Sequence, residues 1–110
     1  METEPFAAER KFALNTMNPD KAPRMAPVIQ AIRRRLASRP GEWVSHDDLT
    51  TSARVAGDLA EQTITNRIAV MVKIGMIEKR GGYQRWFDRR VSRMVAKDTR
   101  AYRLGDWPSP

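Results

Sequence analysis

Cysteine is absent from this chain of 110 residues, and histidine occurs only once. Without cysteine the chain can form neither a disulfide framework nor a thiolate metal site, which is typical of an intracellular protein. Long apolar runs are also absent, and the start of the chain lacks the charged and then apolar pattern of a secretion signal. We therefore expect a cytoplasmic protein without a membrane span. The length predicts one domain with a modest core and no second, ligand-binding domain.

The residue groups that catalysis commonly needs are equally scarce. The single histidine, His46, stands beside Asp47 and Asp48. Three adjacent side chains point in different directions, and no second group of ligands completes a metal site, so a helix start explains this trio better. The sequence also lacks a glycine loop for phosphates, a nucleophile with a base, and carboxylates spaced for acid–base chemistry. We expect no enzyme activity, no metal and no cofactor.

Positive charge is abundant and unevenly placed. Twenty Lys and Arg residues against thirteen Asp and Glu residues give a net charge of +7. Residues 79–103 contain nine of the basic residues and two of the acidic ones, so this segment carries the whole excess while the remainder is balanced. Such a footprint predicts a polyanionic partner. A merely soluble, arginine-rich surface would spread its charge along the chain.

The clearest local pattern lies in residues 58–80. Asp58, followed three residues later by Glu61, is a capping signal that predicts a helix start. Helical spacing predicts a core-facing stripe of Ala60, Ile64, Ile68, Met71, Val72 and Gly75. The opposite side holds short amides, small residues and a cation, namely Gln62, Asn66, Ala69 and Lys73, flanked by Thr65 and Val70. Gly75 ends the helix, and a short alternating strand, 76–80, runs into the turn signal Gly81-Gly82.

Two further helices are expected before this stretch. Residues 24–38 predict the first, with outward arginines at 33–35 and an apolar stripe of Met25, Val28, Ile29, Ile32 and Leu36. Trp43 and Val44 form a short apolar pair that can join a later hairpin as a third strand. Ser45 then caps the next helix, with Asp47 and Asp48 in its first turn. Its expected buried side is Leu49, Ala53 and Val55.

The two ends of the chain lack a sustained pattern. Residues 1–23 favour a flexible arm. Within them residues 6–14 could instead form a short helix, and the arm would then dock or dimerise through apolar residues such as Phe12. Residues 105–110 predict a tail, in which Trp107 can fold back on the body.

Residues 83–104 have two interpretations. One is a long β-hairpin, with 83–88 running out, 89–92 turning and 93–104 returning; it is favoured because 98–104 has the composition of a strand. The other places a short helix at the tip, since Phe87, Val91, Met94 and Val95 also satisfy helical spacing. Trp86 and Phe87 could stack on unpaired bases, but at least one of them is expected to pack in the core.

The run Thr63-Ile64-Thr65-Asn66-Arg67-Ile68, followed by Met71 and by Gly75-Met76-Ile77, resembles the recognition helix and first wing strand of winged helix-turn-helix proteins. The order helix, strand, helix, turn, helix, hairpin is similar too, so the resemblance covers residues 25–104. It implies a DNA-binding domain at 24–104 that is mainly α with a small antiparallel β-sheet (α+β), with three helices and a long basic β-hairpin wing. A small basic domain of this kind also looks like many phage or mobile-element regulators.

From these features we expect sequence-specific binding to double-stranded DNA by a small transcriptional regulator that acts through site occupancy. The third helix would present Gln62, Thr65, Asn66 and Ala69 to base edges in the major groove, because Gln and Asn amides suit adenine. Phosphates or the minor groove would be contacted by Thr63, Lys73, Lys79, Arg80, Arg85, Arg89, Arg90 and Arg93. In a bacterium or phage the protein would be nucleoid-associated.

Two alternatives stay open. The first is a protein-interaction module, an inhibitor or adaptor that uses the winged-helix fold. Outward Val70 and Ile74 and the phenylalanine-containing arm favour it, although these residues could equally form a homodimer face. The second and weaker alternative is binding of single-stranded DNA or RNA through the wing aromatics.

Overall fold

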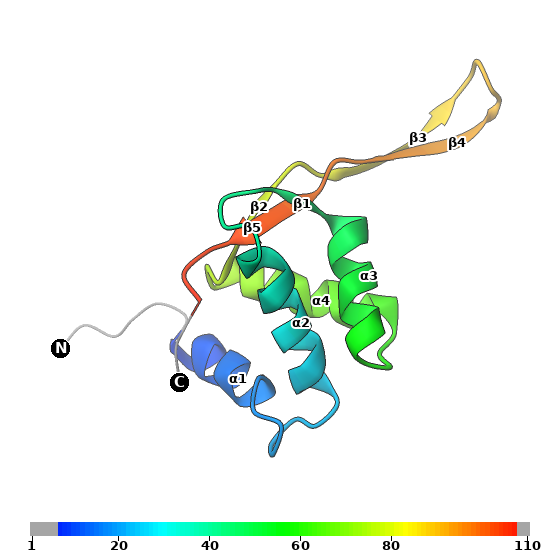
Figure 1. Ribbon diagram of the computed structural model, residues 1–110. Coiled ribbons are helices and arrows are strands. Elements are labelled where there is room, and N and C mark those ends of the chain that lie inside the picture. Colours follow the sequence, from blue (N-terminus) through cyan, green and yellow to red (C-terminus); the bar gives the residue numbers. More distant parts are fainter. Residues whose placement is uncertain (1–6, 108–110) are drawn as a thin grey trace.

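Four helices and a small antiparallel sheet make up this α+β fold, seen in a computed structural model that describes residues 7–107 apart from the side chain of Glu9 (Figure 1). The helices are α1 (Ala7–Thr16), α2 (Met25–Ala37), α3 (His46–Ala56) and α4 (Glu61–Lys73). The strands are β1 (Val44–Ser45), β2 (Ile77–Arg80), β3 (Tyr83–Asp88), β4 (Arg93–Asp98) and β5 (Ala101–Leu104).

The strands form two separate ladders. In the three-stranded sheet β5 lies between β1 and β2, with Val44 opposite Tyr102 and Glu78 opposite Arg103. Strands β3 and β4 pair only with each other, and we call residues 83–98 the hairpin. The hairpin projects beyond the helices, on the opposite side of the molecule from α1 (Figure 1). It makes the protein elongated, with extents of 56 × 35 × 25 Å and a radius of gyration of 15.8 Å, against about 13 Å for a compact domain of this size.

The core lies between α2, α3, α4 and the three-stranded sheet. Helix α4 buries Ile64, Ile68 and Met71, whose spacing of four and three residues keeps them on one face. The sheet adds Val44, Ile77 and Tyr102 to the same cluster. The predicted core stripe is thus confirmed for these α4 residues, while Ala60 is exposed and precedes the helix. Ile74, expected to face outward, is only 4% exposed, so that expectation was wrong.

The helix count is four rather than the three that the sequence predicted, because α1 forms within the segment for which a flexible arm was favoured and a short helix left open. Ala13 of α1 is buried in the core cluster, and the Arg67 guanidinium lies 4.9 Å from the centre of the Phe12 ring. Arg10 donates to the carbonyl of Ile74 and to Asp106. One small apolar residue and polar contacts hold this helix, so its sequence shows no long apolar stripe. The rest of the expected arm and tail, residues 1–6 and 108–110, lies outside the described residues.

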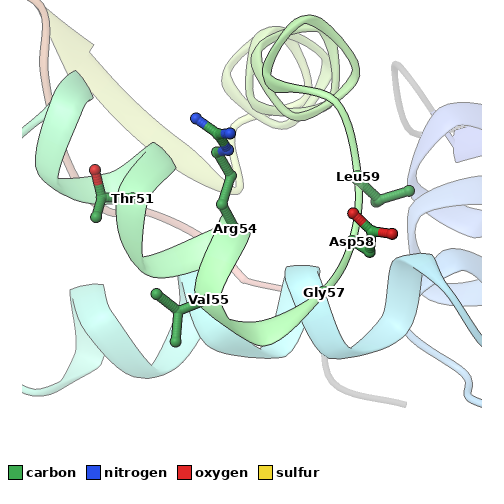
Figure 2. A pocket seen from close by; sticks show the side chains of 6 residues that line it. All are labelled: Thr51, Arg54, Val55, Gly57, Asp58 and Leu59. Atoms are coloured by element: carbon green, nitrogen blue, oxygen red, sulfur yellow. The ribbon is translucent and has the colours of Figure 1, made fainter.

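Helix α4 does not begin as predicted. Its N-cap is Ala60, without a side-chain cap, whereas the sequence indicated Asp58. Leu59 packs against the core, which holds the connection from α3 in a non-helical path until Ala60. Figure 2 shows Asp58 and Leu59 on this connection, beyond the end of α3. Val55, in the last turn of α3, is 86% exposed rather than buried as expected, because Leu49 and Ala53 supply the inner face.

Several other local predictions are confirmed. Ser45 is the N-cap of α3 and accepts a hydrogen bond from the amide of Asp48. Val44 joins the sheet through β1. Trp107 folds back and packs against the core cluster, beneath the Arg33 guanidinium, which lies 5.8 Å from the centre of its ring.

The hairpin interpretation of residues 83–98 is confirmed, and the interpretation as a helix at the tip is wrong, because the ladder runs without a break from Tyr83–Asp98 to Asp88–Arg93. The returning segment is two strands, since the chain leaves the ladder at Thr99 and Arg100. Trp86 and Phe87 are 43% and 57% exposed. The expectation that at least one of them packs in the core was therefore wrong, because the hairpin extends past the body that would have covered it.

Candidate nucleic-acid interface

An open pocket of about 520 Å³ lies where α4 meets the base of the hairpin. Its lining comes from three parts of the chain: the start of α3, the first turns of α4, and the base of the hairpin. The lining residues are His46, Glu61, Gln62, Thr65, Tyr83 and Arg100. The outward side of α4 and the basic hairpin, separated in the sequence, therefore border one concave surface, which we call the cleft.

The exposed face of α4 runs along one edge of the cleft. Gln62, Asn66, Ala69 and Lys73 are all exposed and follow one another at helical spacing, as the sequence predicted. The Gln62 side-chain amide donates to the Asn66 carbonyl oxygen over 2.9 Å. This contact holds the two amides in a row and leaves the Gln62 oxygen and the Asn66 amino group to face a ligand. Thr63 is exposed on the neighbouring face of the same helix.

Thr65 takes a different position from its neighbours on α4. It is partly buried, and its Oγ1 lies 3.5 Å from Nε2 of His46. The other ring nitrogen of His46, Nδ1, lies 2.9 Å from the hydroxyl of Tyr102 on β5. His46 thus links the sheet, α3 and α4 at the floor of the cleft. Thr65 is turned into the cleft and away from the open row formed by Gln62 and Asn66.

The surroundings of His46 disfavour its charged form. The residue is 5% exposed. Burial is the main cause that lowers the pKa of His46 below its ordinary value, and the positive charge of Arg100 lowers it further. His46 lies at the start of α3, as the sequence predicts, but its contacts with Tyr102 and Thr65 were not predicted. The pairing with Tyr102 spans 56 positions in the chain, so no local pattern indicates it.

Arg100 and Tyr83, which sequence reasoning also missed as site residues, form the hairpin side of the cleft. Arg100 donates two hydrogen bonds of 2.9 Å to the carboxylate of Asp98. This pairing is the main cause that lowers the pKa of Asp98 and raises the pKa of Arg100. The Arg100 guanidinium also lies 5.4 Å from the centre of the Tyr83 ring. The hairpin side of the cleft is therefore held by an ion pair and is locally neutral, and the four hairpin arginines lie farther out.

The hairpin carries a net charge of +3, which is part of the excess positive charge of the chain. Pairing places Arg85 on the face of Tyr83 and Phe87, and Arg93 on the face of Gln84 and Trp86. Arg89 and Arg90 occupy the turn, where Arg90 lies 3.4 Å from Asp88 and its side chain remains 90% exposed. The four hairpin arginines predicted to contact phosphate thus project on the hairpin that begins at the cleft.

Two further predicted phosphate contacts, Lys79 and Arg80, are neighbours on β2 and therefore lie on opposite faces of the three-stranded sheet. Lys79 is opposite Tyr102 and shares its side of the sheet, toward the helices. Arg80 lies on the other side, where its guanidinium is 4.6 Å from the centre of the Trp43 ring. Arg103 approaches the same ring at 4.5 Å and pairs with Glu78. Arg80 therefore belongs to a stack on the outer sheet face and is not brought to the cleft.

A second pocket, of about 310 Å³, lies at the connection between α3 and α4 (Figure 2). It is lined by Thr51, Arg54, Val55, Gly57, Asp58 and Leu59, and Figure 2 shows the Arg54 side chain extending from α3 toward α4. The described part of the chain contains no group of three or more His, Asp or Glu side chains placed to hold a metal ion. Among residues 7–107, none of the helices is long and apolar enough to cross a membrane.

Comparison with protein-family models finds no match for this chain. Searches of curated proteins and of solved structures likewise find no significant similarity.

Proposed function

We propose that this chain binds double-stranded DNA sequence-specifically, as a winged helix-turn-helix domain of a small transcriptional regulator that acts by occupying its site. In this assignment α3 and α4 are the helix-turn-helix pair, α4 is the recognition helix, and the hairpin is the wing. The observation that carries the proposal is the cleft, because it joins the polar row of α4 to the base of a hairpin rich in arginine.

Sequence would be read by the exposed row of α4. A major groove about 12 Å wide admits an α-helix, and Gln or Asn amides can pair with the N6 and N7 edge of adenine. The Gln62–Asn66 hydrogen bond supports this role because it orders both amides before the DNA arrives. Ala69, one turn on, is small enough to contact a thymine methyl group. Thr65 would act from the floor of the cleft, by a hydroxyl contact.

Affinity would come from the cations outside the row. Lys73 at the end of α4 and the hairpin residues Arg85, Arg89, Arg90 and Arg93 would contact phosphates, with Thr63 and Lys79 at the margins. Phosphate contacts set register and add affinity without reading sequence. Each one should add about one unit to the salt slope of binding.

The test compares two double variants on duplexes selected from a random pool. Gln62→Ala with Asn66→Ala should flatten discrimination between sites, at a cost of about 1–3 kcal/mol for each lost base contact. Arg89→Ala with Arg90→Ala should weaken all sites alike and reduce the salt slope by about two.

Arg24→Ala with Arg34→Ala is the matched control, since it removes the same charge from exposed positions before and within α2. It should leave both site discrimination and the wing-dependent part of the salt slope intact. Duplex binding that does not depend on salt, or no duplex binding at all, would refute the proposal.

A second candidate is a protein-interaction module, which could also be a homodimer. The exposed Phe12, at 52%, and the exposed apolar residues of the hairpin favour it, whereas the burial of Ile74 removes one of its original supports. Retention of one protein partner after nuclease treatment would favour this candidate. Binding of single strands through the hairpin aromatics is the weaker alternative, and competition between single-stranded and duplex oligonucleotides separates it from the first proposal.

A further inference from the structure

The hairpin carries an unusual amount of exposed apolar surface. Five of the seven large apolar side chains that are well exposed within residues 7–107 lie on it: Tyr83, Trp86, Phe87, Val91 and Met94. A two-stranded ribbon is at best marginally stable in water without a covered face. This ribbon has apolar residues on both faces, and beyond its base at Tyr83 they are left about half exposed. Such a surface is expected to be buried against a partner.

Two of these side chains form a unit near the tip. Phe87 lies directly opposite Met94, so both side chains project from the same face. They are 57% and 49% exposed. The next pair outward is Asp88–Arg93, and the turn beyond it contains Arg89 and Arg90. An apolar pair is thus placed one step behind a cationic tip. Trp86 and Val95 form the corresponding pair on the opposite face.

Charge favours a polyanion as the occupant. The hairpin contains five basic residues and two acidic ones, a net charge of +3. A second copy of the hairpin would bring the same charge against it, which disfavours self-association through this element. A nucleic-acid duplex offers the matching arrangement, because its phosphates lie outside and its apolar base stack lies inside.

The length of the hairpin also fits a nucleic-acid duplex as the occupant. Six residues of β3 span about 20 Å, and the hairpin starts at the cleft beside α4. With α4 in the major groove, the neighbouring minor groove lies about half of a 34 Å helical turn away. A minor groove of about 6 Å is too narrow for a ribbon. Entry therefore requires the groove to open, and apolar side chains that enter between base pairs open it by unstacking a step.

We infer that the Phe87–Met94 pair is a wedge that enters the base stack from the minor groove next to the α4 contact and bends the duplex. This inference rests on the proposed function. Phosphate contacts by Arg89, Arg90 and Arg93 hold the wedge in place. Specificity then gains a second source, because flexible pyrimidine–purine steps at the wedge position would bind more tightly than stiff ones.

The test measures DNA bending by energy transfer between fluorophores at the two ends of a duplex of about 30 base pairs that carries the motif enriched from a random pool. The wild type should bend it by about 20–90°. Phe87→Ala with Met94→Ala should abolish the bend and the preference for a flexible step, yet still enrich the part of the motif that α4 contacts. The single variant Phe87→Leu, which keeps an apolar side chain at this position, should bend the duplex as the wild type does. Trp86→Ala with Val95→Ala is the matched control on the opposite face and should keep the bend.

A second measurement uses a duplex with one mismatched pair at the wedge position, where unstacking costs less. The wild type should bind it about tenfold more tightly than the matched duplex, and the Phe87→Ala/Met94→Ala variant should show no such preference.

The outcomes separate the two claims. Failure of the wild type to bind any duplex overturns the proposed function and the wedge together. Specific binding without a bend, or a bend that survives the double variant, overturns only the wedge. Nuclease-resistant capture of an acidic protein that depends on Phe87 and Met94, without DNA bending, also overturns it and makes the hairpin a protein-docking element.

Discussion

The hairpin and the rest of the described chain, which we call the body, differ in how far their apolar side chains are buried. In the body, residues such as Ile32, Leu49 and Ile64 are completely buried, and their spacing follows the elements that carry them. In the hairpin, the large apolar side chains are about half exposed and both faces are mixed with arginine. Burial in the body accounts for stability, whereas exposed apolar and cationic surface in the hairpin does not. Stability and candidate binding surface are thus separated along the chain.

The hairpin is connected to the three-stranded sheet by residues 81–82 and 99–100, which we call the joint. The two chain segments of the joint lie in close contact. Gly81 has a φ of +76°, and a Cβ added there would lie 2.1 Å from the carbonyl oxygen of Thr99. The Thr99 amide donates to the carbonyl of Gly82, and the Gly82 amide donates to Oγ1 of Thr99. The joint therefore sets the direction in which the hairpin leaves the sheet, and with it the orientation of the hairpin toward α4.

The largest predicted effect contrasts one residue from each region. Ile64→Ala should lower the free energy of unfolding by about 2–5 kcal/mol, because it leaves a cavity in a fully buried site. Phe87→Ala should change it by less than about 0.5 kcal/mol, since Phe87 is 57% exposed. Urea denaturation measures both. A loss of more than 1 kcal/mol in Phe87→Ala would contradict the separation, because the hairpin would then stabilise the body.

The next effect concerns the joint. Gly81→Ala should cost about 1–2 kcal/mol for its left-handed conformation alone, and the contact with the Thr99 backbone should shift the hairpin. Gly82→Ala is the matched control, because open space surrounds the added Cβ. Urea denaturation measures the effect on the free energy of unfolding. The salt slope of DNA binding reports separately on the orientation of the hairpin. Equal behaviour of the two variants would show that the joint does not control the hairpin.

The body could be predicted from the sequence far better than the hairpin. Ile64, Ile68 and Met71 repeat at the helical period, and Ser45 stands before two acidic residues, so local rules suffice for both. The exposed row of Gln62, Asn66, Ala69 and Lys73 followed from the same period. The predicted start of α4 was wrong because the packing of the partly buried Leu59 against the core overrode a capping signal at Asp58.

The features that could not be predicted depend on contacts between residues that are distant in the sequence. His46 and Tyr102 meet across the fold, and Arg100 comes beside Tyr83 only once the sheet forms. Hydrophobicity cannot reveal whether a body lies beneath Trp86 and Phe87, because the same residues suit a core and a protruding ribbon. For that reason the core role expected for these aromatics was wrong, while the strand pattern itself was confirmed.

A smaller effect should follow from acid. The pKa of His46 lies below its ordinary value near 6.5, so just below that value the unfolded state binds more protons than the folded state. Stability should therefore fall as the pH drops below about 6.5. Arg100 stays charged throughout this range, and its pairing with Asp98 keeps the pKa of that carboxyl below its ordinary value.

His46→Leu should remove this part of the pH dependence. At neutral pH it should cost about 1–2 kcal/mol, because the Tyr102 hydroxyl loses its partner. Thermal unfolding between pH 7 and pH 5 is the measurement. An unchanged slope in the variant would mean that another group causes the acid sensitivity.

The smallest predicted effect comes from the ion pair between α2 and α3. Arg35 donates two hydrogen bonds to Asp48, of 2.7 and 3.2 Å, and these are the main cause that lowers the pKa of Asp48. The stabilisation is present above the ordinary Asp value near 4 and is lost as the pH falls through the lowered pKa. Because the two side chains are 32% and 44% exposed, Asp48→Asn should cost only about 0.5 kcal/mol at neutral pH. Glu42→Gln, which breaks the more exposed pair with Arg39, should cost less still. A cost above 2 kcal/mol for Asp48→Asn in urea denaturation would show that this pair, and not the apolar core alone, fixes α3 against α2.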